Sequence, residues 1–361
     1  DGGFSYWGGK DSSDVALTAY AIRFLNDAKQ FIKVDETVIK KATDYLVNQQ
    51  QADGSFTKKY YWESSTDSNR TKLFTSYVAR TLAILVGGNA TVKERVSTQS
   101  NDTLPDGRIS ALAKALEYLK KRNDEIDEPY ALALYGLASL DAGNIDAANK
   151  TAQLLAKMVI PEDNAVYWKL ETNTPFYGWG TAGRVETTAL VVQLLLKTKI
   201  NQDLVSRGML FLLKNKDRYG VWYSTQTTIN VLDSFLATLS TEKTVETQTL
   251  QVLLNGENLQ NITVPPDQIT PITVDLTNKL DAKTNRVEVK GSSNSPLMSQ
   301  IVSAHYIDWK DSEASGKNTN QSRQLRLDYK CDKQNAAIMQ EVNCSAEAER
   351  VGFKGYGMLL A

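Results

Sequence analysis

The sequence predicts a mainly α-helical protein whose first part is a partial α/α toroid, a double ring of helices, followed by antiparallel β-structure. Three observations support this prediction. A Gly-aromatic loop recurs in front of apolar segments, the helical segments between these loops alternate between two kinds, and the hydrophobic period changes near residue 240. The first two observations predict the ring of helices, and the third separates it from the β-part.

The recurring loop combines glycine with aromatic side chains. Copies lie at residues 1–7, 53–56, 177–179 and 219–222. Glycine permits the positive φ of a tight turn, and a buried aromatic side chain contributes roughly 2–3 kcal/mol. A repeated loop of one kind predicts an array of helical hairpins, in which the loops hold neighbouring helices together.

The helical segments alternate between one-sided and two-sided apolar patterns. The two-sided segments, 73–86 and 189–196, are apolar most of the way round and must be covered on both sides. The one-sided segments carry a narrow stripe: Ile39, Ala42 and Leu46; Ile109, Leu112, Leu116 and Leu119; Ile145, Ala148, Ala152 and Leu155. Residues 1–240 are therefore predicted to form a toroid, with two-sided helices inside and striped helices outside.

Beyond residue 240 the apolar residues alternate with period 2, which is typical of strands. Residues 241–310 are predicted to form an antiparallel β-domain, with strands at 250–254, 262–264, 272–276, 287–289 and 301–309. Residues 311–322 are rich in Ser, Gly, Asn and Lys and are predicted to be a linker. A further β-domain, residues 323–361, begins with a strand at Leu325 and continues to the last residue.

Composition excludes some partners. The 41 Lys and Arg against 42 Asp and Glu give a net charge of -1, so no electrostatic argument favours nucleic acid or an anionic membrane. No apolar run reaches the roughly 18 residues of a transmembrane helix. The chain starts with Asp1 and shows no signal-peptide pattern, so we expect it to be a fragment of a longer polypeptide.

Two cysteines, Cys331 and Cys344, flank an expected hairpin. A turn at residues 332–335 would place Cys331 opposite about position 338, with Cys344 roughly 20 Å further along the strand. Because a disulfide needs Cα atoms within about 7 Å, this register predicts no bridge between them.

Asn-X-Ser/Thr sequons occur at seven positions, a number that chance could produce in a chain this rich in Asn, Ser and Thr. They matter only in a eukaryotic secretory pathway. Their asparagines are Asn69, Asn89, Asn101, Asn149, Asn261, Asn320 and Asn343.

Several segments together resemble the α2-macroglobulin and complement C3/C4/C5 superfamily of thioester proteins. Residues 185–190 (VETTAL) and 219–228 (YGVWYSTQTT) resemble the last helical hairpins of its thioester domain. Residues 17–20 with 50–56 match an earlier hairpin, and the tail from 342 onward resembles the receptor-binding, macroglobulin-like domain, more in its bacterial form. The β-segment after the toroid would be the second half of a CUB-like domain. The order of these pieces makes the resemblance specific.

The resemblance implies a broad-spectrum protease-trapping inhibitor rather than an enzyme. In that family an attacking protease cuts a bait segment, and a buried Cys-Gln thioester becomes exposed and acylates a nearby nucleophile. The expected partners are therefore endopeptidases, the expected location is extracellular or the bacterial periplasm or cell surface, and no cofactor or metal is expected. The thioester motif, Cys-X-Glu-Gln, would lie one helical hairpin before Asp1, since neither Cys331 nor Cys344 is followed by that pattern.

The resemblance also implies a loop that faces the thioester, and approximate alignment places Tyr61, Trp62 and Glu63 there. Some complement members carry a histidine in this loop that redirects the acyl group toward hydroxyls. The toroid contains no histidine. A thioester in the parent protein is therefore expected to react directly with amines such as lysine.

Other polar residues have ordinary structural explanations. The single histidine, His305, is expected to be a plain strand residue, because a catalytic or metal site needs convergent partners. The acidic run 124–128 before Pro129 predicts the start of a helix, where carboxylates are favoured. Ser224 is expected to be an N-cap rather than a nucleophile.

Two other classes of function remain open from the sequence. An α/α-toroid enzyme, such as a terpene cyclase, prenyltransferase or polysaccharide lyase, would need a zinc site, an acidic motif inside the ring or a base with a partner. The toroid contains neither Cys nor His, and its acidic cluster lies at a helix start. A noncatalytic surface or scaffold protein whose thioester has been lost is the other alternative.

Overall fold

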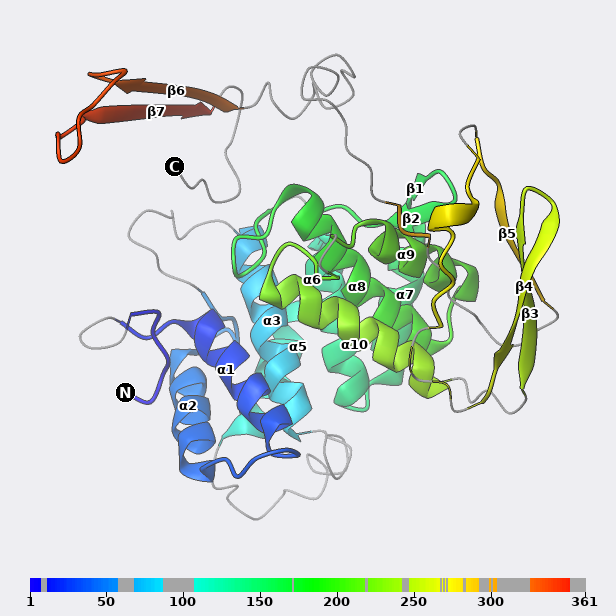
Figure 1. Ribbon diagram of the computed structural model, residues 1–361. Helices are drawn as coiled ribbons and strands as arrows, with labels where there is room; N and C mark the ends of the chain where they lie inside the picture. The colour runs from blue at the N-terminus through cyan, green and yellow to red at the C-terminus, as the bar shows by residue number, and fades with distance from the viewer. Residues whose placement is uncertain are drawn as a thin grey trace. The chain divides into compact units, whose positions relative to one another are not determined.

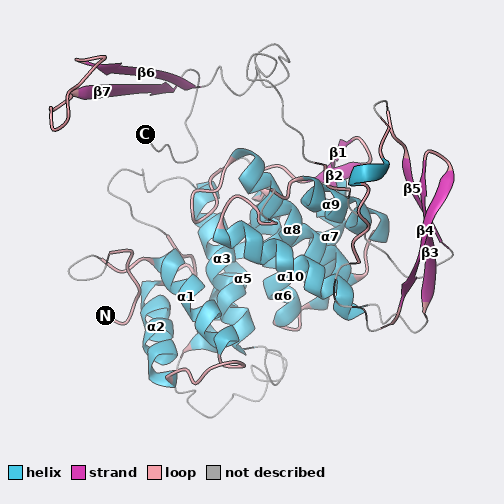
Figure 2. Cartoon of the chain, in the orientation of Figure 1, coloured by secondary structure: helices cyan, strands magenta, loops and turns pink. Residues whose placement is uncertain are grey.

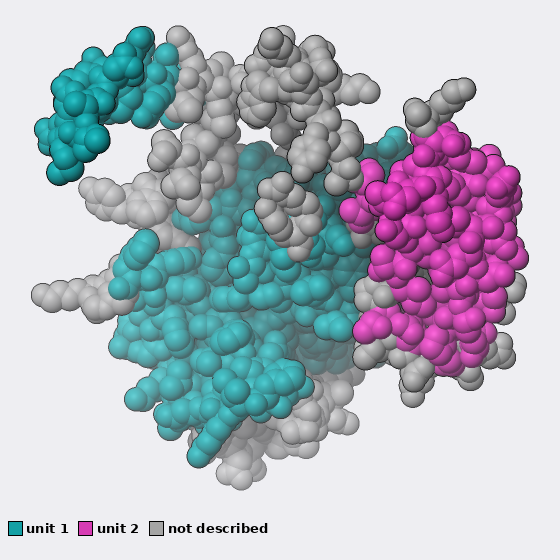
Figure 3. Space-filling model, in the orientation of Figure 1, with its two compact units in different colours: residues 1–237, 325–361 teal, residues 238–324 magenta. Residues whose placement is uncertain are grey.

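The computed structural model describes residues 1–7, 12–57, 68–86, 107–170, 172–217, 220–241, 247–266, 268, 270, 272–281, 284–291, 299, 301–303 and 325–350. The chain divides into two compact units, residues 238–324 and the remainder of the chain (Figure 3). Each part is described by itself below.

The described residues between 1 and 241 are mainly helical (Figures 1 and 2). A two-stranded hairpin, β1 (Ile160–Glu162) and β2 (Ala165–Tyr167), lies between the helix that ends at Lys157 and the helix that begins at Gly180. The helices are α1 (Val15–Ala28), α2 (Glu36–Gln49), α3 (Ser68–Val86), α5 (Arg108–Lys121), α6 (Pro129–Asp141), α7 (Ile145–Lys157), α8 (Gly180–Thr198), α9 (Gln202–Lys214) and α10 (Thr225–Thr241).

The helices form the two layers that the apolar patterns predict. In the inner row, α1 packs on α3, α3 on α6 and α6 on α8, and α10 bonds to α8 through Ser234 Oγ, which donates to the Ala189 carbonyl at 2.9 Å. An ion pair between Arg23 of α1 and Asp233 of α10 joins the two ends of this row. The fold class, a mainly helical protein with a partial α/α toroid, is confirmed.

Burial distinguishes the two layers. In the inner helix α6, residues 129–139 are all buried, so this helix is covered on every side. The outer helices α2, α5, α7 and α9 bury one stripe each. One predicted stripe member is wrong: Ile145 is 59% exposed. It is the first residue of α7, directly after the N-cap Asn144, so no earlier turn of the helix covers it.

The second unit contains an antiparallel sheet of β3 (Gln248–Leu254), β4 (Glu257–Val264) and β5 (Val287–Gly291), in the order β4-β3-β5. These strands confirm three of the predicted β-segments. The strand predicted at 272–276 is wrong: those residues are not in a strand, and Leu276 has αR backbone angles as the N-cap of a 3-10 turn, Thr277–Lys279. Alternation indicates which face of a strand would be buried, but not whether a neighbouring strand is available. Of the last predicted strand, residues 301–303 are not in a strand, and 304–309 lie outside the described residues.

The second β-part is a hairpin of β6 (Leu325–Cys331) and β7 (Cys344–Arg350). The prediction of no disulfide is wrong. Cys331 and Cys344 are directly opposite each other, with Cα atoms 4.0 Å apart, and they are bonded. The error came from the turn: the connection runs over residues 332–343, and Asp332 and Asn343 close it by hydrogen bonds instead of a tight turn at 332–335.

The predicted linker, residues 311–322, lies outside the described residues. The assignments of the β-parts to a CUB-like and a receptor-binding domain remain predictions. Within the part of the chain that is described, no helix has the length and apolar character needed to cross a membrane.

Candidate functional site

The same kind of hydrogen bond occurs in four loops of the helical ring. In each of four loops, the backbone N–H of an aromatic residue donates to a threonine hydroxyl in the inner helix that follows, at 2.8–3.2 Å. The pairs are Phe4 with Thr18 of α1, Phe56 with Thr75 of α3, Trp168 with Thr188 of α8 and Trp222 with Thr228 of α10. These bonds therefore connect the loops to four of the inner helices, α1, α3, α8 and α10.

The two tryptophans also join the inner layer to the outer layer. Trp168 Nε1 donates to the Leu155 carbonyl near the end of α7, and Trp222 Nε1 donates to the Leu212 carbonyl near the end of α9, both at 2.7 Å. Carbonyls in the last turn of a helix lack the usual partner four residues later, and each of these two accepts the indole N–H beside a backbone N–H three residues on. Each tryptophan thus donates one hydrogen bond to an outer helix, through its indole N–H, and one to an inner helix, through its backbone N–H.

The glycines of the first two loops allow close packing against the outer helices. Gly2 and Gly54 both have φ of +92°, and a Cβ there would lie 2.6 Å from the Lys41 carbonyl oxygen and 2.5 Å from that of Lys114. Only glycine combines this φ with this approach at low cost.

The sequence placed the third loop copy incorrectly. It indicated Tyr177-Gly178-Trp179, but the fastening residue for α8 is Trp168, nine positions earlier in the chain than Tyr177. The only signal for Trp168 was an aromatic pair, Tyr167-Trp168, at the end of a short alternating segment.

The segment 172–178, called the cap loop here, instead lies over the inner helices. Its Phe176 ring meets the rings of Tyr20 and Tyr77 edge to face, at centroid distances of 5.7 and 6.0 Å. Arg70 of α3 donates to the Asn173 and Thr174 carbonyls. The cap loop is thus held by α1 and α3 at the end of the ring where the Gly-aromatic loops lie.

Beneath the cap loop lies a buried carboxyl group, Glu186 of α8. Its Oε1 accepts from Tyr130 Oη of α6 at 2.9 Å and from Asn230 Nδ2 of α10 at 3.4 Å. A Cβ added at Gly178 of the cap loop would lie 3.4 Å from Glu186 Oε2. The carboxyl group therefore connects three inner helices directly below the cap loop.

Burial raises the pKa of Glu186 from 4.5 to about 7, and the hydrogen bond from Tyr130 opposes this shift. Burial, with the neighbouring Glu186, also raises the pKa of Tyr130 well above its ordinary value. A buried carboxyl group that titrates near neutrality can hold or release a proton under physiological conditions. We name Glu186, Tyr130 and Asn230 the carboxyl cluster.

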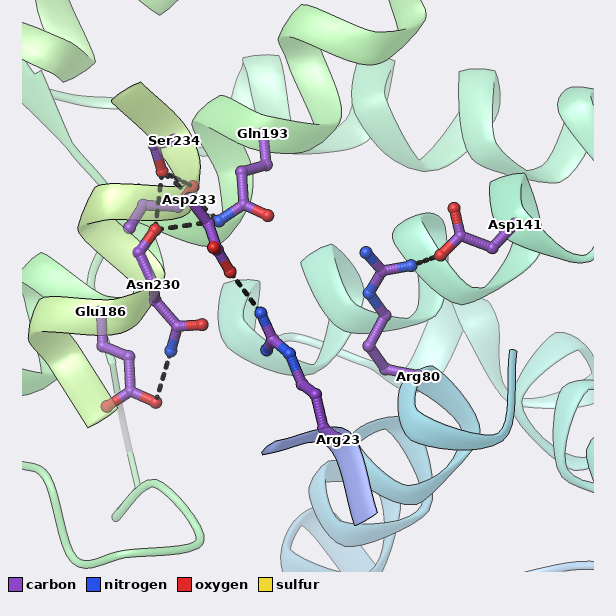
Figure 4. A network of polar contacts seen from close by, with 9 residues as sticks. Arg23, Arg80, Asp141, Glu186, Gln193, Asn230, Asp233 and Ser234 are labelled. Atoms are coloured by element: carbon purple, nitrogen blue, oxygen red, sulfur yellow. Dashed lines mark hydrogen bonds and ion pairs between the residues drawn. The ribbon is translucent and has the colours of Figure 1, made fainter. Parts of the chain in front are cut away.

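A set of charged side chains lies in the inner ring, among α1, α3, α6, α8 and α10 (Figure 4). Arg23 pairs with Asp233 and Arg80 pairs with Asp141. Burial and then the nearby Arg23 lower the pKa of Arg80 to about 9, and burial lowers the pKa of Lys197 to about 8. Figure 4 also shows Gln193 of α8, whose Nε2 donates to the Asn230 carbonyl of α10 at 2.9 Å.

The structure tests some of the residues singled out by the sequence. The acidic run before Pro129 does start a helix, with Pro129 as the first residue of α6 and Glu128 as its N-cap residue. Ser224 Oγ accepts from the Thr227 backbone N–H at 3.1 Å, as an N-cap does. The predicted thioester-facing residues, Tyr61, Trp62 and Glu63, lie outside the described residues, as does His305.

The carboxyl cluster is not among the predicted sites, although the sequence of residues 185–190 resembles the thioester domain. The available signal was one acidic residue inside a helix that is otherwise apolar on all sides. Such a residue must be buried, and a buried carboxyl group needs hydrogen-bond partners.

Comparison with known proteins gives the family. Residues 1–238 match the model of the A-macroglobulin TED domain. Complement C3 of Oncorhynchus mykiss is 26% identical over 314 residues, which are 85% of this chain and 17% of that protein. Thioester-containing protein 1 (allele S1) of Anopheles gambiae is 28% identical over 193 residues, which are 52% of this chain and 12% of that protein.

This chain therefore spans only a small part of the length of both relatives. Both come from animals, and they do not support the bacterial periplasm that the resemblance also allowed. The family match covers the whole helical ring, from the first Gly-aromatic loop to α10. The chain belongs to the A-macroglobulin thioester-domain family, as its resemblance to the α2-macroglobulin and complement superfamily predicted.

Proposed function

We propose that the chain is the thioester-domain region of an extracellular protein that captures attacking proteases covalently, through a thioester in the longer parent protein. The observation that carries this proposal is the match of residues 1–238 to the thioester-domain model. The names of the two relatives, complement C3 and thioester-containing protein 1, support a role in covalent attachment.

The chemistry needs a nucleophile from the target. A target amine attacks the thioester carbonyl, an amide bond forms, the C–S bond breaks, and the cysteine sulfur leaves as a thiolate that takes up a proton. No histidine lies within residues 1–238 to accept the acyl group first. Direct transfer to lysine amines of the bound protease is therefore the proposed route, with Tyr61, Trp62 and Glu63 proposed to face the thioester.

In this proposal the described residues position the reacting groups and do not themselves react. The loop-to-helix hydrogen bonds connect α1, α3, α8 and α10 to the loops that carry the aromatic residues. The cap loop and the buried cluster beneath it make one end of the ring rigid. A rigid frame of this kind suits a domain that must hold a reactive ester away from water until cleavage occurs elsewhere.

The test uses the full-length parent protein, exposed to methylamine and, separately, to a panel of endopeptidases. One thiol released per chain by methylamine, and protease-containing adducts that survive boiling in detergent, are the expected results. Prior treatment with methylamine should abolish the adducts, which makes it the matched control.

Two results would contradict the proposal in different ways. No released thiol would leave the ring as a noncatalytic scaffold. A released thiol with adducts only to bystander proteins or surfaces, and none to the protease, would indicate an opsonin rather than a protease trap.

A further inference from the structure

Four of the seven Asn-X-Ser/Thr sequons lie on described residues, and their surroundings differ sharply. Asn69 and Asn149 are in helices, Asn261 is in a strand and Asn343 is in the hairpin loop. An N-linked glycan is bulky and hydrated, so a folded protein can carry one only where the asparagine and its neighbours face water. The structure can therefore be used to choose among these sites.

The two helical sequons do not meet this requirement. Thr151, which completes the sequon of Asn149, is only 1% exposed, and its hydroxyl donates to the Ala147 carbonyl at 2.8 Å. Arg70, the middle residue of the first sequon, is buried against the cap loop, and Asn69 itself is only partly exposed. Both asparagines lie in helices whose neighbouring side chains pack into the ring.

The hairpin sequon is exposed, but the side-chain amide of Asn343 already donates a hydrogen bond. Asn343 Nδ2 donates to Asp332 Oδ2 at 3.0 Å, and the Asn343 backbone N–H donates to Asp332 Oδ1 at 3.1 Å. These contacts close the loop next to the Cys331–Cys344 disulfide. The nitrogen that would carry the glycan is thus already part of the loop closure.

Asn261 lies on the polar face of the three-stranded sheet. Because side chains alternate along a strand, Asn261 and Thr263 share one face of β4. Their cross-strand partners on β3 are Gln251 and Thr249, and Gln251 also faces Lys290 of β5. All of these residues are exposed.

The opposite face of the same sheet is apolar. It carries Leu250 and Val252 of β3, Ile262 of β4 and Val289 of β5, and Val252 is only 5% exposed. A glycan on Asn261 would therefore project from the solvent-exposed polar face of the sheet. It would not contact the apolar face. Asn261 Oδ1 accepts from Asn258 Nδ2 at 3.1 Å. This hydrogen bond involves the oxygen of the Asn261 amide and not the nitrogen to which a glycan would be attached.

We propose that Asn261 is a site of N-linked glycosylation, on the water-facing side of the β4-β3-β5 sheet. This inference rests on the extracellular location given under the proposed function. The co-reactant is an oligosaccharide carried on a lipid diphosphate in the secretory pathway. A bond forms between Asn261 Nδ2 and the anomeric carbon, the bond from that carbon to the diphosphate oxygen breaks, Nδ2 loses a proton, and the lipid diphosphate leaves.

The glycan would also protect an edge. Among the described strands, β4 pairs with β3 alone. A hydrated oligosaccharide on a strand with an unpaired edge hinders pairing with a strand of another molecule.

The test expresses the whole 361-residue chain in eukaryotic cells behind a secretion signal, which separates this question from the native location of the protein. Translocated protein, secreted or retained, is digested with peptide N-glycosidase F in heavy-oxygen water, and peptides are mapped by mass spectrometry. The expected result is conversion of Asn261 to labelled Asp in most molecules. This primary measurement uses the unmodified sequence, so no variant has to fold.

Variants then assign the glycan. Asn261→Gln and Thr263→Ala should each remove one glycosidase-sensitive mobility step, whereas Asn149→Gln, the matched control, should remove none. Translocated protein with unlabelled Asn261 would overturn the inference, as would label at Asn149 in the folded, protease-resistant fraction. The thiol-release assay on the parent protein is independent, so failure of either proposal leaves the other standing.

Discussion

The inner and outer helices of the ring differ in how they treat polar groups. The inner helices α6 and α8 are buried on nearly all sides, and their polar side chains find partners within the ring, as Glu186 does with Tyr130 and Asn230. The outer helices bury one stripe each; their charged side chains face water, and buried hydroxyls such as those of Thr43 and Thr151 donate to carbonyls of their own helix. The difference shows that one helical array can place chemistry-bearing groups in its inner row while the outer row supplies only support. Substitutions in the two rows should therefore have very different effects.

The largest effect is expected at Trp168, which joins the rows. Trp168→Ala removes a fully buried indole and the hydrogen bond from its Nε1 to α7. We expect a loss of about 3–5 kcal/mol in the free energy of unfolding, measured by urea denaturation. Trp7→Ala is the control, because Trp7 is 90% exposed and its removal should change stability by less than about 0.5 kcal/mol. Similar losses for both variants would mean that Trp168 does not connect the two rows.

The next effect tests the buried carboxyl group of the inner row. The Glu186 pKa is raised from 4.5 to about 7, so between these values the native protein holds a proton that the unfolded chain has lost. Its contribution to stability is complete below about pH 4.5 and is lost as the pH rises through about 7. This linkage is worth about 3 kcal/mol between the two limits.

Glu186→Gln keeps an oxygen for Tyr130 but cannot ionise, so it should remove that part of the pH dependence. Urea denaturation at pH 5 and pH 8 measures the difference between variant and parent. Glu117→Gln, in the exposed surface of the outer helix α5, is the matched control and should leave the pH profile unchanged. An unchanged profile in Glu186→Gln would show that the carboxyl group is not the titrating group.

A smaller effect is expected where the two rows touch. A Cβ at Gly208 of α9 would lie 2.6 Å from Val192 Cγ2 of α8. Val192 is β-branched and has little freedom to move in a helix. Gly208→Ala should therefore destabilise by about 1–2 kcal/mol, the overpacking cost less the gain in helix propensity. Thermal unfolding of Gly208→Ala beside Gly208→Ser checks this, since a larger side chain should lower Tm further.

The smallest effect is expected on the water side of the outer row. Ile145→Ser, at the 59% exposed start of α7, should change the free energy of unfolding by less than about 0.5 kcal/mol. Leu155→Ala, ten residues along the same helix and fully buried, should cost about 2–5 kcal/mol. If Ile145→Ser were as costly as Leu155→Ala, the distinction between stripe and surface on α7 would be wrong.

The sequence predicted the helical ring because its signals were local and repeated. The spacing of apolar residues over a few helical turns distinguishes a helix buried on one side from a helix buried on two sides. The loops repeat one combination of glycine and aromatic residues. The failure at Ile145 has a local cause, since this residue begins its helix, whereas the failures at residues 272–276 and at Cys331 with Cys344 depend on what lies across from a residue, which no single segment encodes. The carboxyl cluster is of the same kind, because Glu186, Tyr130 and Asn230 come from three helices that only the closed ring brings together.

The disulfide of the β6–β7 hairpin determines what a cut in its loop would do to the chain. Cys331 and Cys344 are separated by 13 positions and enclose an exposed loop that includes Ile338 and Met339. A single cut inside this loop would divide the polypeptide but leave both strands covalently joined. The nicked molecule would migrate as one band without reductant and as two bands with it. The hairpin could thus lose the continuity of its backbone and keep its pairing.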